Sequence, residues 1–157
     1  MKLSTKARYA VMALLDMLKE GMEAPVSLVS ISERQNLPLP YLEQIFSKLR
    51  KSNIVTSARG SQGGYILSRH SSEITLYDII ISVDKEFKSR RCLNVSIGCQ
   101  PGGIRCLTHD LWAKLDNVIE HFFKSLTLNQ VLSRDVANMV FFIPTLPNEL
   151  QTNKEVA

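Results

Sequence analysis

The sequence predicts a mainly α-helical protein with one short β-hairpin. Apolar residues recur at helical spacing through most of residues 5–132. Two short β-prone runs, residues 54–57 and 65–67, flank a glycine-rich turn, as expected for a hairpin. The longest helical pattern covers residues 110–126 and would span about 26 Å. Together these features predict a small helical domain followed by a long C-terminal helix.

Charge is distributed unevenly along the 157 residues. Residues 1–91 contain 14 Lys and Arg against nine Asp and Glu, whereas residues 92–157 contain five against six. The length suits one ordinary hydrophobic core. A basic N-terminal part beside a nearly neutral C-terminal part favours a polyanionic partner for the former.

The N-terminus has no recognisable secretion signal, because charged residues reach deep into it and Asp16 interrupts the apolar stretch that follows. No run approaches the roughly 18 apolar residues of a membrane span. We therefore expect a cytoplasmic protein without a membrane partner. Cysteines there are usually reduced, so a cluster of three favours metal binding or thiol redox chemistry over disulfides.

The first predicted helix covers residues 5–19 and has an apolar stripe at helical spacing. Ser4 or Thr5 can cap its start, and Gly21 is placed to end it. Lys6 lies in the first turn, where its positive charge opposes the helix dipole. A bound phosphate would relieve this repulsion, which makes Lys6 a candidate DNA contact. A solvated surface charge explains it equally well.

A helix-turn-helix is predicted next. Ser27 is placed to cap a helix over residues 28–35, with Val29 and Ile31 among its buried side chains. Pro40 suits the first turn of a second helix that continues to about residue 51. Two short helices joined by a tight turn are typical of this motif, whose second helix enters the major groove of DNA.

The second helix has an apolar and a polar face. Its inner residues are Leu42, Ile45, Phe46 and Leu49. Glu43 and Gln44 lie outside and are candidates for reading bases, since glutamate can accept from cytosine and glutamine can pair with adenine. Lys48 and Lys51 are candidates for contacts to phosphate.

A β-hairpin wing follows this helix. Its turn, residues 58–64, contains Arg59 and the glycines Gly60, Gly63 and Gly64. Glycines let the backbone approach a phosphate closely, and the arginine can enter a narrow minor groove. A generic hairpin would explain the glycines. It would not explain the five Lys and Arg and the complete absence of Asp and Glu from residue 48 to residue 70. The sequence therefore predicts a winged helix-turn-helix.

All three cysteines and one histidine fall within eighteen residues. Cys92, Cys99, Cys106 and His109 have the spacing C-x6-C-x6-C-x2-H, and the glycines and proline between them favour a loop. Thiolate-rich sets select zinc, copper(I) or iron–sulfur clusters. Spacing alone does not separate iron–sulfur from zinc, for which three cysteines and a histidine are a common structural set. Thiol redox switching without a metal is a third hypothesis.

The C-terminal half continues the helical pattern. Thr75 and Asp78 predict a helix that starts with a capping box. The helix over residues 110–126 is apolar around so much of its circumference that it must be buried on more than one side. A second subunit is the expected cover, which predicts a homodimer, and burial within its own domain is the alternative. A short helix over residues 127–132 and a partly disordered tail follow.

The chain resembles the IscR/NsrR family of bacterial transcription regulators, and most of all its iron–sulfur cluster regulators. The similarity lies in KARYAVMALLDM, ISERQ, YLEQIFSKLRK, the R-G-x-x-G-G-Y wing and the C…GCQ…CLTH-x-LW block. It covers about residues 1–133 and fails in the tail. The helix and wing motifs are specific to the family, and the block of three cysteines and one histidine is specific to its cluster-bearing subgroup.

The resemblance implies a winged helix-turn-helix dimer with one [2Fe–2S] cluster per subunit. Cys92, Cys99, Cys106 and His109 match the ligand positions. Cluster-bearing members repress cluster-assembly genes while the cluster is present, and loss of the cluster relieves repression. The positions that match DNA contacts are Tyr41, Glu43, Gln44, Arg59 and the wing glycines.

The chain departs from the family pattern in two places. Each gap between the cysteines is one residue longer, and Pro38 and Pro40 replace small hydroxyl residues at the start of the second helix. The prolines remove possible phosphate or base contacts there, so the DNA target sequence is not implied by the resemblance.

These observations divide the chain into four parts. Residues 1–88 form the winged helix-turn-helix domain, residues 89–109 the cluster-binding loop, residues 110–133 the dimerisation helix with the short helix after it, and residues 134–157 the tail. The favoured function is a DNA-binding repressor that senses cluster status. A zinc-stabilised or thiol-redox regulator of other genes is the alternative. An iron–sulfur electron carrier has no use for the basic wing, and no nucleophile–base set indicates an enzyme.

Overall fold

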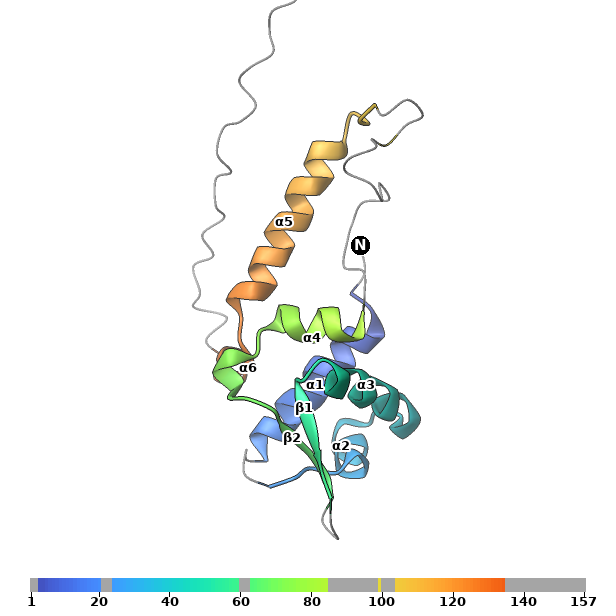
Figure 1. Ribbon diagram of the computed structural model, residues 1–157, viewed down its shortest axis with the longest axis vertical. Coiled ribbons are helices and arrows are strands. Elements are labelled where there is room, and N and C mark those ends of the chain that lie inside the picture. The colour runs from blue at the N-terminus through green and yellow to red at the C-terminus, as the bar shows by residue number, and fades with distance from the viewer. Residues whose placement is uncertain (1–2, 21–23, 60–62, 85–98, 100–103, 135–157) are drawn as a thin grey trace, which may run out of the picture.

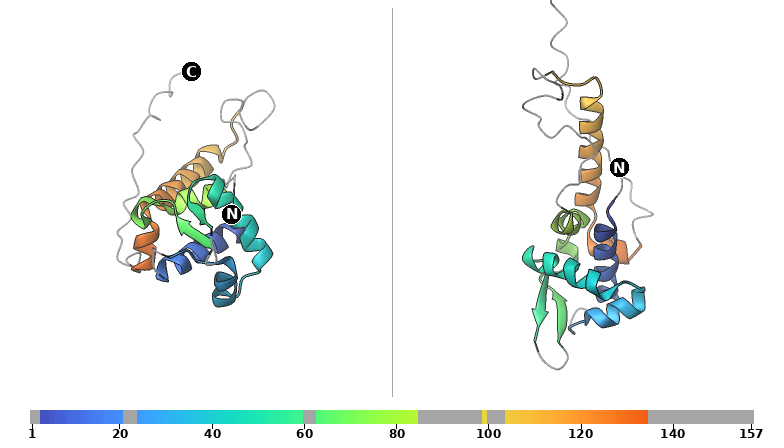
Figure 2. Two further views of the ribbon diagram at one scale, coloured as in Figure 1. Left: turned by 60° about the horizontal axis from the view of Figure 1, so that its bottom comes forward. Right: turned by 90° about the vertical axis from the view of Figure 1, so that its right-hand side faces the viewer.

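The structure, a computed structural model, describes residues 3–20, 24–59, 63–84, 99 and 104–134. Within these ranges the helices are α1 (Thr5–Lys19), α2 (Leu28–Gln35), α3 (Leu39–Lys51), α4 (Leu76–Val83), α5 (His109–Ser125) and α6 (Leu128–Leu132), with a 3-10 helix, η1, at Ser71–Glu73. The strands β1 (Val55–Ala58) and β2 (Gly64–Leu67) form the hairpin. Helices α1 to α4 gather in a bundle, with the strands at one end and α5 extending from the other (Figures 1 and 2).

Helix α1 forms the centre of the bundle. The Oγ of Ser4 caps it by accepting a hydrogen bond of 3.2 Å from the N–H of Ala7. The buried face of α1 carries three small residues, Ala7, Ala10 and Ala13, and all three are fully buried. Because alanine side chains are short, neighbouring helices can approach closely, and α1 contacts α2, α3, α4 and α6.

The turn between α2 and α3 is fixed by local hydrogen bonds. Asn36 ends α2 in the left-handed conformation with φ 51°, which asparagine adopts more readily than most residues. The N–H of Leu37 donates to the carbonyl of Ser32, and the hydroxyl of Ser32 donates to the carbonyl of Leu37. Pro40 lies in the first turn of α3, as predicted. Helix α3 buries all four predicted inner residues.

The wing is an antiparallel pair in which Val55 lies opposite Leu67 and Ala58 opposite Gly64. The segment before α2 adds a third pairing, because Val26 and Tyr65 exchange two backbone hydrogen bonds of 3.0 and 2.9 Å. The ring of Tyr65 also packs against Phe46 of α3, with 4.9 Å between the ring centroids. The base of the wing is therefore held to the helix-turn-helix on two sides.

Helix α4 begins at the joint between α5 and α6. The N–H of Leu76 donates to the carbonyl of Leu126 at 2.8 Å, and the N–H of Leu128 donates to the carbonyl of Ile74 at 2.9 Å. These bonds tie the start of α4 to the end of α5. Helix α5 leaves the bundle at this joint (Figure 1).

The boundaries predicted for the helices and strands agree with the structure to within one residue, and the capping box of Thr75 and Asp78 is confirmed. Three differences remain. The 3-10 helix η1 was not predicted, Leu126 follows α5 instead of ending it, and Val29 is exposed instead of buried. Helix α2 directs Ile31 to the core and Val29 to solvent. The predictions for Gly21 and for the tail beyond Arg134 lie outside the described residues.

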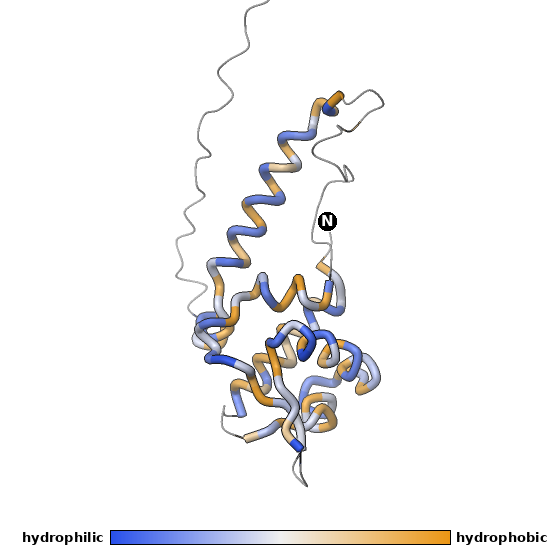
Figure 3. Tube along the Cα trace, in the orientation of Figure 1, coloured by the Kyte–Doolittle hydropathy of each residue, from blue (hydrophilic) through white to orange (hydrophobic). Residues whose placement is uncertain are grey.

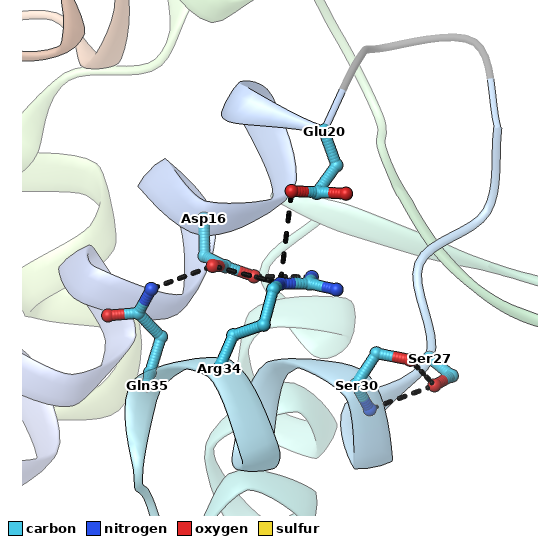
Figure 4. A network of polar contacts seen from close by, with 6 residues as sticks. All are labelled: Asp16, Glu20, Ser27, Ser30, Arg34 and Gln35. Carbon is cyan, nitrogen blue, oxygen red and sulfur yellow. Dashed lines mark hydrogen bonds and ion pairs between the residues drawn. The ribbon is translucent and has the colours of Figure 1, made fainter.

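A buried carboxylate joins α1 to α2 (Figure 4). Asp16, only 5% exposed, accepts hydrogen bonds of 2.6 Å from Arg34 Nη2 and 2.7 Å from Gln35 Nε2. Burial raises the pKa of Asp16, but the hydrogen bonds from Arg34 and Gln35 and the charge of Arg34 outweigh it. The pKa of Asp16 therefore lies below its ordinary value, and the carboxylate is charged at neutral pH.

Replacing this carboxylate should destabilise the domain. Asp16→Ala leaves Arg34 and Gln35 without their acceptor, and we expect it to lower the free energy of unfolding by about 2–3 kcal/mol. Because the folded pKa is depressed, this stabilisation is present above the unfolded pKa of about 4 and is lost as pH falls through the folded pKa. Denaturant unfolding at neutral pH and at several values from about pH 5 to pH 2 measures both effects.

Glu20→Ala is the matched control. Glu20 lies 3.9 Å from Arg34 Nε and its side chain is about half exposed, so we expect a change of less than about 1 kcal/mol. Equal losses of unfolding free energy in the two variants would contradict the assignment of this stabilisation to Asp16.

Candidate metal centre and nucleic-acid interface

Three of the four predicted metal ligands converge at the start of α5. The Sγ atoms of Cys99 and Cys106 and a ring nitrogen of His109 all lie within 4.8 Å of one another. The Cys99 Sγ and His109 Nδ1 atoms are 2.9 Å apart. The fourth predicted ligand, Cys92, lies outside the described residues.

Two backbone hydrogen bonds bring these donors together. The N–H of His109 donates to the carbonyl of Cys106 at 3.0 Å, which closes a tight turn over the C-x2-H pair. The N–H of Cys99 donates to the carbonyl of Ile104 at 3.0 Å and brings Cys99 to the same place. His109 is the first residue of α5 and only 3% exposed, whereas the two thiols are half-buried. The imidazole thus forms the inner side of the site.

The donor set fits a thiophilic metal. Nitrogen and sulfur ligands lie about 2.0–2.3 Å from a tetrahedral zinc, and therefore roughly 3.5–4 Å from one another. The three donor atoms, all within 4.8 Å of one another, need only small movements to reach this geometry. Two thiols and an imidazole suit iron–sulfur or zinc and do not suit magnesium or calcium.

The predicted DNA contacts on α3 differ in exposure. Glu43, Gln44 and Lys51 are exposed, as expected for side chains that meet a ligand. Tyr41 is half-buried, and its ring meets Tyr9 of α1 edge to face, with 5.6 Å between the ring centroids. The first turn of α3 is therefore braced against α1.

Lys48 has a different environment from the other polar residues of α3. Its Nζ donates a hydrogen bond of 2.8 Å to the carbonyl of Val83, the last residue of α4. The predicted phosphate ligand is thus directed toward the protein in this structure. A contact between two elements 35 residues apart leaves no signal in the local pattern around Lys48.

The remaining predicted DNA contacts lie on α1 and the wing. Arg59, directly after β1, is exposed, and Lys6 in the first turn of α1 is half-buried. Gly63 is half-buried, and Gly60 lies outside the described residues. Gly64 has a packing role, because a Cβ at this position would lie 2.5 Å from the carbonyl oxygen of Val26.

The family model for Rrf2, an iron-dependent transcriptional regulator, matches residues 3–134. This chain belongs to the Rrf2 family. The HTH-type transcriptional regulator IscR of Photorhabdus laumondii is 47% identical over 133 residues, which are 85% of this chain and 80% of that protein. IscR of Serratia proteamaculans has the same identity and coverage.

Solved structures of other regulators have the same fold. CymR, the global cysteine regulator of B. subtilis, has a TM-score of 0.72 and 32% identity, covering 85% of this chain and 98% of its own. IscR of T. potens has a TM-score of 0.69 and 37% identity, covering 90% of this chain and 93% of its own. The resemblance and the winged helix fold predicted from the sequence are both confirmed.

The Rrf2 protein is accordingly a DNA-binding transcriptional regulator and not an enzyme, since its relatives are named as regulators. In the ranges that the structure describes, every helix is too short or too polar to cross a membrane.

The packing role of Gly64 can be separated from DNA contact. Gly64→Ala places a Cβ 2.5 Å from the carbonyl oxygen of Val26, and the backbone shift that follows should cost about 1–3 kcal/mol of stability. Thermal unfolding measures this. Ser57→Ala, an exposed change on β1, is the control and should stay within about 0.5 kcal/mol. Unchanged stability of Gly64→Ala together with weaker DNA binding would refute the packing role.

Proposed function

We propose that this Rrf2 protein is a homodimeric repressor that senses iron–sulfur cluster supply through one [2Fe–2S] cluster per subunit and controls cluster-assembly genes. The convergence of Cys99, Cys106 and His109 at the start of α5 carries the proposal. The IscR names of its relatives support an iron–sulfur cluster as the occupant. Cys92 is the proposed fourth ligand.

The residues of the site suit a sensor. A bound [2Fe–2S] cluster supplies a redox-active group, and an imidazole among thiolates raises its reduction potential above that of an all-thiolate cluster. His109 is held by its place in the first turn of α5 and by burial, whereas Cys99 and Cys106 keep one side of the site accessible. A group held partly at the surface can be lost and rebuilt more readily than one enclosed in the core.

The exposed end of α5 supports a homodimer. Leu111 and Trp112 are 61% and 41% exposed, and Ile104 and Leu107 just before the helix are exposed as well. Phe122, at the other end, packs against the core. Hydrophobic residues recur along the whole of α5, including the part that extends from the bundle (Figure 3). A second copy of the helix would cover this apolar surface, with the two-fold symmetry usual for dimers.

The proposed DNA interface uses the recognition helix and the wing. Glu43 and Gln44 are exposed near the start of α3 and are proposed to read bases, with Tyr41 beside them. Lys6 and Lys51 are proposed to contact phosphates. The wing contributes Arg59, Gly60 and Gly63. In this proposal, residues 1–88 bind DNA, residues 89–109 hold the cluster and residues 110–133 form the dimer. The protein acts in the cytoplasm, where bacterial DNA lies.

Zinc is the second candidate occupant. The same two thiols and imidazole match a structural zinc site, with Cys92 completing a tetrahedron. A zinc-bound protein would keep its DNA-binding role and lose the sensing mechanism, because zinc has no redox chemistry.

The metal content decides between these candidates. Protein purified without oxygen should be brown and contain about two irons and two sulfides per chain. Cys92→Ala and Cys99→Ala should each lose the cluster while sedimenting as folded dimers. The measurements are a visible spectrum, iron, sulfide and zinc assays, and sedimentation. A colourless wild-type protein with about one zinc per chain would favour the zinc site, and full iron in Cys92→Ala would remove that residue from the ligand set.

The wing contact has a separate test. Arg59→Ala should weaken DNA binding by roughly tenfold or more and lower the salt dependence of binding by about one ion, while cluster content is unchanged. Fluorescence anisotropy over a range of salt concentrations measures both effects. Lys114→Ala removes the same charge from an exposed position on α5 and should leave DNA affinity almost unchanged. Equal affinity of Arg59→Ala and wild type would exclude the arginine from the interface.

A further inference from the structure

The two described cysteines lie near the start of α5 with their sulfurs close together. The Sγ atoms of Cys99 and Cys106 are no more than 4.8 Å apart. A disulfide joins two sulfurs at about 2.05 Å, so the two atoms must approach each other before they can bond. Rotating a cysteine about its Cα–Cβ bond from one staggered position to the next moves its sulfur by roughly 3 Å. The pair is therefore within reach of a disulfide.

The backbone holds the two cysteines together without the help of a metal. The N–H of Cys99 donates to the carbonyl of Ile104 at 3.0 Å, and Cys106 follows Ile104 by two residues. The N–H of His109 donates to the carbonyl of Cys106 at 3.0 Å, which fixes Cys106 at the start of α5. Neither hydrogen bond has a metal as a partner. After a metal group has left the site, the two thiols should therefore stay side by side.

Both thiols are accessible to a small oxidant. Cys99 and Cys106 are half-buried, whereas His109 on the inner side of the site is only 3% exposed. The contact of 3.9 Å between the Cys106 Sγ and the Thr108 hydroxyl lies at the surface. Exposure helps to decide which cysteines an oxidant reaches, and a second thiol nearby converts the first oxidation product to a disulfide. This pair meets both conditions.

We propose that Cys99 and Cys106 form a disulfide within one chain when the metal-free protein meets a peroxide, and that this disulfide closes the site to metal. This regulation of the site rests on the proposed function only for the identity of the metal group that is excluded. The disulfide itself needs only the two thiols.

The reaction proceeds in two balanced steps. Hydrogen peroxide transfers one oxygen to the first sulfur as its O–O bond breaks, which gives a sulfenic acid and one water. The second sulfur then displaces the hydroxyl group from the first, and this group leaves as water with the proton of the second thiol. In sum, the two thiols lose two electrons and two hydrogens, and hydrogen peroxide is reduced to two waters. A dithiol reverses the oxidation by thiol–disulfide exchange.

Metal binding and the disulfide exclude each other. Cysteine binds a metal as the thiolate, and neither sulfur of a disulfide carries that charge. Of the proposed ligands, only Cys92 and His109 would remain, which are too few for a closed tetrahedral site. In a reducing compartment such a disulfide lasts only while the oxidant persists. Peroxide therefore delays the reloading of the site, and a dithiol restores it.

Trypsin gives a direct test, because Arg105 lies between the two cysteines. Cys99 falls in the tryptic peptide of residues 92–105. Cys106 falls in the peptide of residues 106–114. Metal-free protein is treated with a small excess of hydrogen peroxide, its remaining thiols are blocked under denaturing conditions, and the unreduced digest is analysed by mass spectrometry. We expect the two peptides to be joined in most chains, with the bond located at Cys99 by fragmentation of the joined pair.

Cys92→Ala is the matched control, because Cys92 lies in the same tryptic peptide as Cys99. It should form the joined peptides at the wild-type rate. Cys99→Ala should form them roughly tenfold more slowly, because the two backbone hydrogen bonds do not hold its remaining cysteines together. Equal rates in the two variants would overturn the proposal. Should a variant fail to fold, the fragmentation of the wild-type pair still decides.

Other products would also overturn the proposal. A disulfide within the peptide of residues 92–105 would make Cys92 the partner of Cys99. A bond between two chains, which a non-reducing gel detects, would make the oxidation intermolecular. Sulfinic and sulfonic acids without joined peptides would show that the two sulfurs do not meet.

The exclusion of metal has its own measurement. Zinc binding, measured by competition with a chromogenic chelator, should be mostly lost after peroxide treatment and restored by a dithiol. Protein loaded with zinc beforehand should form the joined peptides more slowly than metal-free protein, and equal rates would overturn the exclusion. Failure of the sensing function is distinguishable, because a chain that binds no iron–sulfur cluster can still form the disulfide. A chain that binds the cluster and gives no joined peptides once metal-free would overturn the disulfide alone.

Discussion

The close packing of helices against the alanine face of α1 is the constraint on which the rest of the structure depends. Ala7, Ala10 and Ala13 are fully buried, and α2, α3, α4 and α6 all contact this one helix. A larger side chain at these positions would push the neighbouring helices apart. The recognition helix α3 and the helix α4 that leads to the metal donors therefore share a single support.

Much of the fold could be predicted because it is encoded locally. Helix boundaries followed from apolar spacing, from the caps at Ser4 and Ser27, and from the capping box at Thr75. The features that escaped prediction depend on distant residues or on weak patterns. The pairing of Val26 with Tyr65 joins chain segments far apart in sequence, and the three residues of η1 are too few to show a period.

The candidate site divides in the same way. The spacing of Cys99, Cys106 and His109 was enough to predict that these side chains gather into one candidate metal site, because a C-x2-H turn and a nearby thiol converge by backbone geometry. The pattern around Lys48 predicted a phosphate contact and gave no sign of the carbonyl that Lys48 binds, because that carbonyl lies 35 residues away. Asp16 could have been identified, because it lies three residues after the buried Ala13 on the apolar face of α1 and a carboxylate there requires a partner.

The hydrogen bonds between Val26 and Tyr65 also determine how the wing is placed relative to α3. They fasten the base of the wing to the segment in front of α2, and Tyr65 packs on Phe46 of the recognition helix. The wing and the recognition helix α3 are thus held in a fixed position relative to each other. One inserted base pair displaces the next contact by about 3.4 Å along the DNA axis. A wing and a helix α3 in a fixed relative position cannot follow this displacement. On the proposed DNA interface, spacing within the target, as well as its base sequence, therefore becomes part of what the protein would recognise.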